Sequence, residues 1–307
     1  MTENTDALKY FVELFSSGLT RGSIYALLAL GYTLVYGIIG LINFAHGEVY
    51  MISAFVGLMV AGFLSIQGYG MLSMLFIALV FAMIYAAAYG FTIERVAYKP
   101  LRQASRLAPL ISAIGMSIFL REYIILAQTP DFISFPPLIP KIQFLKRFSN
   151  YIEPSELMII MVSIVTMIML LFLIKRTKIG KAMRSIAQDR EMAMLLGVNV
   201  NQVISMTFML GSVLAAIGAI LISSHIGQIN FNIGFLVGIK AFTAAVLGGI
   251  GSIRGAVLGG LVLGLTESLC TGFVSSDYED VFAFSILVLI LIFKPTGILG
   301  KETIEKV

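Results

Sequence analysis

Apolar residues occur in this chain in long runs that are separated by short polar intervals. About 20 consecutive apolar residues in a helix cross the hydrocarbon core of a bilayer, so such runs predict membrane spans. The predicted spans cover residues 10–30, 49–65, 72–93, 108–127, 157–174, 203–223, 256–271 and 281–293. This pattern predicts an all-α integral membrane protein, a polytopic bundle of about eight or nine transmembrane helices.

Two glycine-rich stretches interrupt the pattern. Residues 31–47 contain four glycines around the polar Asn43 and His46, and residues 235–255 contain five glycines with Lys240 and Arg254. Apolar segments that glycine interrupts predict broken or re-entrant helices, tolerated where protein or water covers the freed backbone. For residues 31–47, a tight turn that links two closely packed spans is the alternative.

The polar intervals predict which side of the membrane each loop occupies. Six basic residues fall in residues 175–190 and four in residues 95–106. Short loops rich in Lys and Arg stay in the cytoplasm during insertion. We therefore place both intervals and the C-terminus in the cytoplasm, and the proline-rich residues 129–154 on the periplasmic side as a structured cap. Nine spans would put the N-terminus outside.

The second half of the longer basic interval is predicted to form a short helix. Asp189 is a suitable N-cap, Glu191 favours the first turn, and Gly197 can form a left-handed C-terminal turn. One apolar face would comprise Met192, Leu195 and Leu196. A short capped helix between two spans is typical of an element that docks onto a partner.

Composition independently indicates a membrane protein. Of the 307 residues, 58% are hydrophobic and only 12% are charged, whereas an ordinary soluble domain carries about 25% charged residues. The mean hydropathy is +0.95. We therefore expect the chain to lie in a lipid bilayer and count the bilayer among its partners. The net charge of +4 is modest and its basic residues lie in loops, so we expect no nucleic-acid partner.

Several stretches resemble a known family. The sequence EMAMLLG at residues 191–197 resembles the E-A-A-x-x-x-G motif of ABC importer permeases, with Met192 in place of the first alanine and without the downstream I-x-L-P. Residues 31–51 (GYTLVYGIIGLINFAHGEVYM), 241–253 (AFTAAVLGGIGSI) and 295–300 (PTGILG) closely resemble the permease subunits of high-affinity branched-chain amino acid importers. The resemblance covers nearly the whole chain.

The resemblance implies a single transmembrane permease domain over residues 1–307, in a multi-pass protein of the bacterial inner (plasma) membrane. Such a subunit moves Leu, Ile and Val into the cytoplasm. The loop at about residues 175–201 would seat its coupling helix in an ATPase. The residues assigned to coupling are Arg184, Asp189, Glu191, Ala193 and Gly197.

The same resemblance implies four kinds of interaction. The expected partners are a homologous sister permease, two ATP-binding cassette ATPases and a periplasmic amino-acid-binding protein, besides the bilayer. The small residues around positions 248–264 would suit close packing against the sister permease.

The residues predict no catalysis in this chain. Gly180-Lys181 is followed by alanine rather than the Ser or Thr of a P-loop, and Arg254 stands where a dinucleotide fingerprint needs its third glycine. Two distant histidines and one cysteine form no metal-ligand cluster. We therefore expect no catalytic, cofactor-binding or metal-binding residues, and ATP hydrolysis in the partner subunits.

Three polar residues are candidates for the translocation pathway: Asn43, His46 and Glu48. An ionisable group at membrane depth costs about 2.5–3.5 kcal/mol on insertion scales, so it usually faces protein or water. They would line the inner mouth of the pathway or relay movement from the ATPase. Alternatively, His46 and Glu48 contact a helix end or a loop. For Arg121 and Glu122, snorkelling or mutual pairing near the interface is favoured over a functional role.

Other functions are open at this stage. A related ABC permease for urea or short amides would share most of these features. An ion-coupled secondary amino acid transporter would need no ATPase, and the coupling-helix pattern argues against it. A membrane enzyme would need a cluster of catalytic side chains, and none is visible in the sequence.

Overall fold

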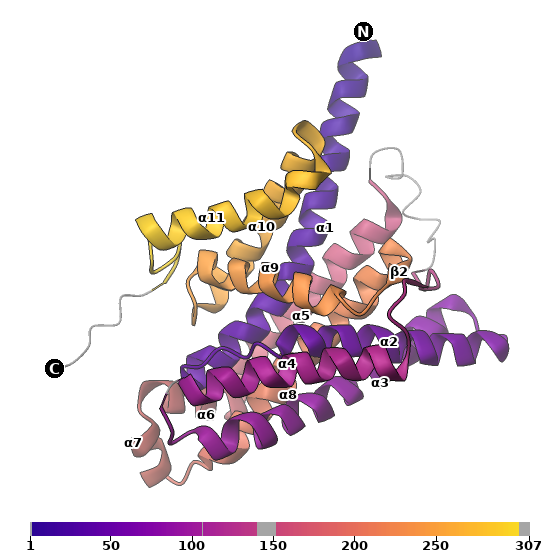
Figure 1. The fold of residues 1–307 in the computed structure, drawn as a ribbon. Coiled ribbons are helices and arrows are strands. Elements are labelled where there is room, and N and C mark those ends of the chain that lie inside the picture. Colours follow the sequence, from indigo (N-terminus) through magenta and orange to yellow (C-terminus); the bar gives the residue numbers. More distant parts are fainter. Residues whose placement is uncertain (1, 106, 140–151, 301–307) are drawn as a thin grey trace.

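The computed structural model describes residues 2–105, 107–139 and 152–300, with side chains from residue 9 onward, and is a helical bundle (Figure 1). Its α-helices are α1 Thr2–Ile39, α2 His46–Ile66, α3 Met71–Ile93, α4 Leu107–Ala127, α5 Pro154–Arg176, α6 Lys178–Gln188, α7 Arg190–Leu195, α8 Val200–Ile226, α9 Ile233–Gly248, α10 Ile253–Phe273 and α11 Glu279–Phe293. In the described part of the chain, seven are long and apolar enough to cross a membrane, namely α1, α2, α3, α4, α5, α8 and α10. The predicted all-α membrane bundle is thus confirmed.

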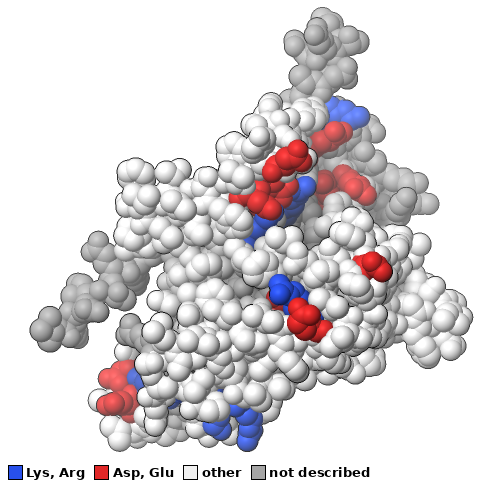
Figure 2. Space-filling model, in the orientation of Figure 1, with Lys and Arg blue, Asp and Glu red and all other residues white. Residues whose placement is uncertain are grey.

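An inner group of helices is covered by an outer group. Most side chains of α1, α2 and α8 are buried, whereas α3, α4 and α5 expose large apolar side chains such as Phe76, Ile111 and Met169. Figure 2 shows a face that is mostly uncharged, with charged groups confined to a few places. Apolar surface of this extent is stable only against lipid or another apolar surface.

Helix α1 packs along α10 through glycines on both helices. A methyl group on Gly22 would lie 2.9 Å from the Leu261 Cα, and one on Gly264 would lie 2.6 Å from the Gly18 carbonyl oxygen. Glycines four residues apart let two backbones approach closely. The expectation that these glycines face a sister permease is therefore wrong for Gly264, because α1 of the same chain occupies that face.

The contacts of α1 also determine the direction of its neighbours. Gly31 lies against Gly211 of α8, whereas Leu28 lies against Gly218. Helix α8 therefore runs opposite to α1. Helix α10 also runs opposite to α1. Gly18 lies against Leu265, whereas Gly22, which comes later in α1, lies against Leu261, nearer the start of α10. The starts of α8 and α10 thus share one side of the bundle with the end of α1.

The first glycine-rich stretch contains a break that is shorter than the sequence predicted. Helix α1 continues through Gly31, and only residues 40–45 are non-helical, beginning at Gly40 with φ +68°. The His46 ring at the start of α2 lies against Gly31. Because Gly31 precedes the end of α1 by two turns, the loop runs back roughly 12 Å along α1. Helix α2 therefore begins inside the bundle.

The second glycine-rich stretch is mostly helical. Its break lies between α9 and α10, where Gly249 and Gly251 have φ values of +101° and +91°. The segment after α11 closes on this break, since the Ile298 N–H donates to the Leu247 carbonyl at 2.8 Å. The chain after α11 therefore lies on the same side as the starts of α8 and α10.

Two intervals predicted as loops contain helical turns. The basic interval continues α3 as a π-helical turn, Glu94–Tyr98, and a 3₁₀ turn, Lys99–Leu101. Residues 275–280, an acidic interval without a basic residue, form a 3₁₀ turn, Ser276–Tyr278, and the first residues of α11, Glu279 and Asp280. The Glu279 and Asp280 carboxylates pair with Lys240 of α9.

The long proline-rich segment forms part of a cap. Strand β1, Ile133–Ser134, pairs antiparallel with β2, Gln228–Ile229, at the end of α8. Leu138 is fully buried, and its N–H donates to the Ser224 hydroxyl at 2.7 Å. The described part of the predicted cap is thus structured, and residues 140–151 lie outside the described residues.

The contact between α1 and α10 can be tested with an added methyl group. We expect Gly264→Ala to destabilise the protein by about 1–3 kcal/mol, the usual cost of overpacking, since the methyl would meet the Gly22 backbone. The control, Gly62→Ala, adds its methyl to an open position of α2 and should be neutral or stabilising. The measurement is the fraction that stays monodisperse in detergent after heating. Equal loss in both variants would contradict the packing.

Candidate functional site

Helix α6 is fastened to the end of α5. The Thr177 hydroxyl caps it by accepting the Gly180 N–H at 3.1 Å, and Arg184 Nη1 donates to the Ile174 carbonyl at 2.6 Å. Arg184 thereby satisfies one of the carbonyls left free at the C-terminus of α5. This predicted coupling residue holds α6 at a defined angle to the membrane helix that precedes it.

Both ends of α7 have the predicted caps. The Asp189 carboxylate accepts the Met192 N–H at 2.9 Å. At the other end Gly197 has φ +83°, its N–H donates to the Met194 carbonyl at 3.0 Å, and the Val198 N–H donates to the Ala193 carbonyl at 3.0 Å. This pair of bonds is a Schellman motif, which requires the left-handed conformation that glycine adopts without strain.

The surface of α7 divides into an anchored side and a free side. Ala193 is buried against the rest of the chain. In contrast, Leu195 is 82% exposed and Leu196 is 75% exposed, while Glu191 is also exposed. The apolar face predicted from the sequence therefore points away from the bundle. Exposed apolar side chains of this kind are typical of surfaces that bind a protein or a membrane.

A buried ion pair lies beside this surface. Arg102 pairs with Glu94, which also accepts the Ser205 hydroxyl at 2.6 Å, and Arg102 Nη1 donates to Asn201 Oδ1 at 2.7 Å. Burial lowers the pKa of the Arg102 guanidinium, the Glu94 carboxylate opposes that shift, and the charge of Arg190 adds to it. The pair joins the turns after α3 to the start of α8, directly after α7.

The predicted pathway residues lie together at the connection between α1 and α2. The Asn43 side chain accepts the Ala45 N–H at 3.2 Å and so closes the turn. The His46 ring packs edge-on against Tyr32, with centroids 4.8 Å apart. Both side chains are buried and hold the re-entering loop in place.

Glu48 has a different environment. It is 1% exposed, and its Oε1 accepts the Ser117 hydroxyl at 3.0 Å. Its Oε2 has no hydrogen-bond partner in the described part of the chain. Its partner Ser117 and its neighbour Gly47 line a cavity of about 320 Å³ between α2, α4 and α9, so the carboxylate lies directly behind the wall of this cavity. The residues that line this α4–α9 cavity are Tyr32, Phe44, Gly47, Ile114, Ser117, Ile118, Arg121, Gly234, Phe235, Gly238, Ile239 and Phe242.

A second set of charges forms a buried network that the sequence did not reveal. Lys240 of α9 lies 3.2 Å from Glu267, 2.8 Å from Glu279 and 2.8 Å from Asp280. Glu279 also pairs with Arg21 of α1 at 2.8 Å. An ionisable residue within an apolar span, such as Glu267 in α10, is the signal that could have found it.

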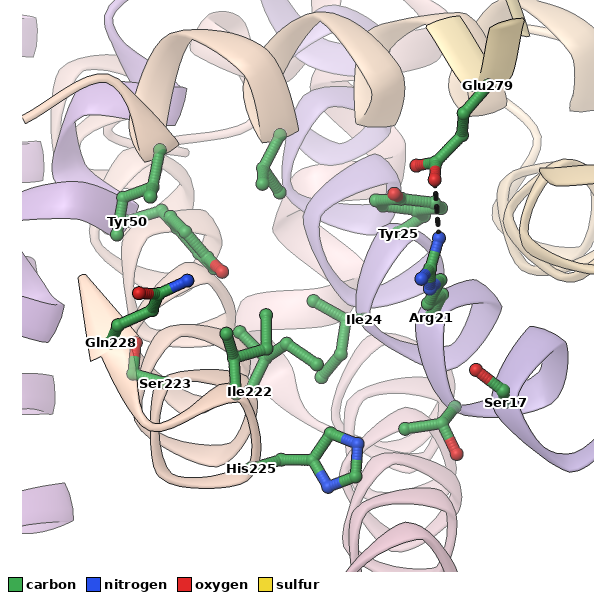
Figure 3. Close-up of a pocket in the computed structure, with 14 residues that line it drawn as sticks. Ser17, Arg21, Ile24, Tyr25, Tyr50, Ile222, Ser223, His225, Gln228 and Glu279 are labelled. Carbon is green, nitrogen blue, oxygen red and sulfur yellow. Dashed lines mark hydrogen bonds and ion pairs between the residues drawn. The ribbon is translucent and has the colours of Figure 1, made fainter. Parts of the chain in front are cut away.

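The network borders a second cavity of about 320 Å³. Figure 3 shows Arg21 pointing at Glu279 across this cavity from Gln228 and Tyr50. The Arg21 and Glu279 charges pair with each other here. We therefore interpret this group as a network that ties α1, α9, α10 and α11 together, rather than as a binding site.

The network predicts a strong effect of removing its lysine. Lys240→Met leaves the fully buried Glu267 without its cation, which costs about 3–5 kcal/mol for a buried pair. We expect much less folded protein in the membrane, and partial recovery when Glu267→Gln is added. The control, Lys9→Met, removes an exposed pair with Glu13 and should change little. The measurement is again survival of heating in detergent, and a Lys240→Met protein as stable as the control would refute the network.

Comparison with known proteins agrees with these features. Residues 14–291 match the family described as branched-chain amino acid transport system / permease component. The chain is 47% identical over 303 residues to the high-affinity branched-chain amino acid transport system permease protein LivH of Salmonella typhimurium, covering 97% of this chain and 98% of that protein. It is likewise 47% identical to the permease protein BraD of Pseudomonas aeruginosa over 302 residues, again 97% of this chain and 98% of that protein.

A solved structure shows a looser likeness. An inward-facing conformation of a putative metal-chelate type ABC transporter superposes with a TM-score of 0.46 at 16% identity, covering 90% of this chain and 81% of that chain. The match to the family extends over most of the chain and includes both α7 and the α4–α9 cavity. The chain belongs to the family of branched-chain amino acid transport permease components.

Proposed function

We propose that this chain is the permease subunit of an ATP-driven importer that moves branched-chain amino acids into the cytoplasm. The observation that carries the proposal is α7, a capped helix with an exposed apolar face, placed between two spans in a chain of this family. The importer's ATP hydrolysis would take place in a partner, and this chain would provide the path.

In the proposed coupling surface each predicted residue has a distinct part. Asp189 and Gly197 terminate α7, and Ala193 fastens it to the bundle. Glu191 lies on the exposed part with the two leucines, available to an ATPase. Through its hydrogen bond to the Ile174 carbonyl, Arg184 would make α6 move together with α5. Movement of α7 would reach α8 directly and the end of α3 through the Glu94–Arg102 pair.

The number of docking helices supports an assembly with two permease chains, and the resemblance to the family implies that the second is a different, homologous one. This chain presents one such helix in its described part, and ATP-binding cassettes work as pairs. A second, homologous permease with its own docking helix would supply the other contact, with one ATPase under each. The exposed apolar side chains of α4 offer this sister a contact surface. An amino-acid-binding protein would dock on the opposite side, where the β1–β2 cap lies.

The proposed setting is the bacterial inner membrane with a cytoplasmic C-terminus. Helix α7 and the basic turns after α3 both adjoin the start of α8. The segment after α11 lies on that same side, since Leu299 N–H donates to the Gly248 carbonyl at 3.0 Å. Basic residues are concentrated at this end of the bundle, which is typical of cytoplasmic loops.

The proposed inner pathway includes the re-entrant connection with Asn43, His46 and Glu48. The loop begins on the cytoplasmic side and returns into the bundle, where α2 starts against Gly31. Asn43 and His46 would hold its shape. Glu48 adjoins the α4–α9 cavity and would face the solute.

The function itself can be tested with the whole transporter. Proteoliposomes that contain this chain with its sister, the ATPases and the binding protein should take up leucine, isoleucine and valine when ATP is supplied. Omitting this chain should abolish uptake, and urea should not compete. Complex isolated through a tag on this chain should contain one copy of it with one sister. Uptake of urea instead of leucine would refute the proposal, and two copies without a sister would refute the assembly.

The coupling surface predicts a separable defect. Leu195→Asp combined with Leu196→Asp should weaken ATPase association and reduce uptake at least tenfold, while insertion and thermal stability stay normal, because both side chains are exposed. Gln103→Asp, an exposed change on the same side, is the matched control. The measurement is the amount of ATPase that co-purifies with the permease. Normal association in the double variant would show that α7 is not the docking helix.

A further inference from the structure

Two groups of opposite charge, one in the wall of the α4–α9 cavity and one directly behind it, do not pair with each other. Glu48 has a free Oε2, and Gly234, which lines the cavity, lies so close that a methyl on it would stand 2.9 Å from that oxygen. Arg121 lines the cavity from α4. The guanidinium is near enough for its charge to act on Glu48, yet within the described residues the two groups form no ion pair.

Arg121 also lacks a strong partner. Its Nε makes no hydrogen bond to the described residues, and its nearest carboxylate, that of the exposed Glu122, lies 3.8 Å away. The guanidinium also lies 6.0 Å from the centre of the Phe235 ring. Arg121 and Glu122 thus form the predicted pair, but as a long contact in which the Glu122 side chain is exposed.

This arrangement differs from the Lys240 network. There each charged group has an opposite charge within about 3 Å, as a structural network in a membrane requires. The buried Glu48 beside the α4–α9 cavity forms no ion pair with the described residues, and its Oε2 has no hydrogen-bond partner among them. A buried charge of this kind is costly unless another group supplies the missing hydrogen bonds.

The rest of the cavity is apolar and open to a solute. Ile114, Ile118, Ile239 and Phe242 contribute hydrocarbon walls, and the closely packed backbones of Gly47, Gly234 and Gly238 form the part of the wall nearest Glu48. The volume of about 320 Å³ lies at the small end of the range for ligand pockets. Helix α4 packs mainly on α2 and on the turns after α3, and its Ile114 and Ile118 are exposed. The cavity therefore opens between α4 and α9.

We propose that this cavity receives the zwitterionic head of a branched-chain amino acid, with its ammonium on Glu48 Oε2 and its carboxylate on Arg121. The branched side chain then lies against Ile114, Ile118 and Phe242. The inference rests on the proposed function, and it identifies the pair of residues that recognises the α-amino and α-carboxyl groups inside the membrane. A zwitterion can pair with both charges at once. An amino acid amide can pair only with the Glu48 carboxylate, and a simple carboxylate only with the Arg121 guanidinium.

The test compares leucine with two analogues that each lack one charge. The permease complex, with its sister and ATPases but without binding protein, is placed in lipid nanodiscs. Binding of radiolabelled leucine is measured in competition with leucinamide, which lacks the carboxylate, and 4-methylpentanoate, which lacks the ammonium. For the unaltered complex, leucine should compete at a concentration about tenfold lower than either analogue.

Each charge should account for one analogue. Glu48→Gln keeps the bond from Ser117 but removes the charge, so leucine should lose its advantage over 4-methylpentanoate and keep its advantage over leucinamide. Arg121→Gln should show the reverse. Glu13→Gln, an exposed carboxylate on α1, is the matched control and should behave as the unaltered complex. A Glu48→Gln complex that still prefers leucine to 4-methylpentanoate tenfold would overturn the proposal.

A second measurement leaves both charged residues intact. In a Cys270→Ser background, Ile118→Cys places a thiol in the cavity wall. Leucine should slow its reaction with a maleimide at least threefold, and 4-methylpentanoate at the same concentration should not. If leucine neither binds nor protects, the binding site is refuted, while leucine uptake by the whole transporter would still support the importer function. Absence of that uptake would refute the function itself.

Discussion

Inside the hydrocarbon of a bilayer, a charged or hydrogen-bonding group has no water and must find its partner within the protein. Lys240 meets this requirement with three carboxylates, one of which also pairs with Arg21. Helix α1 is thereby tied to α9, α10 and α11 at the other end of the sequence. Glu48 meets the requirement only in part, since its Oε1 accepts the Ser117 hydroxyl and its Oε2 has no partner among the described residues. The same constraint distinguishes the structural charge cluster from the solute site that we propose.

Close packing of backbones supports both charge clusters. Gly22 and Gly264 bring α1 against α10, and Gly47 and Gly234 bring the start of α2 against α9. The first contact positions Arg21 and Tyr25 beside the network, where the Tyr25 hydroxyl donates to Glu267 at 2.7 Å. The second contact leaves the Glu48 carboxylate at the wall of the α4–α9 cavity. Small residues thus decide where the charges of neighbouring helices meet.

The two proposed functional regions are joined by packed helices. Helix α7 leads directly into α8, and α8 contacts α1 near Gly31, beside the start of α2. The Glu94–Arg102 pair adds a link from the same end to α3. A displacement of α7 would therefore reach the re-entrant connection that carries Glu48. The proposed docking surface and the proposed amino-acid cavity lie at the two ends of this path.

Local features of the sequence determined much of this protein. The apolar runs predicted the long spans, and Asp189 and Gly197 marked the ends of α7, because span length and helix caps depend on residues that are close in the chain. The basic intervals likewise predicted a common side for α7 and the turns after α3. The first glycine-rich stretch indicated a break, though not its exact place at residues 40–45.

Only the tertiary structure decided which distant residues meet. The sequence contains Lys240 and Glu267, or Glu48 and Arg121, without indicating that the first two pair and that the second two lie near one cavity. It suggested that Gly264 faces another subunit, and α1 of the same chain lies there instead. Contacts of this kind depend on how whole helices pack and on the direction each side chain then takes. No local pattern of hydrophobicity or charge contains that information.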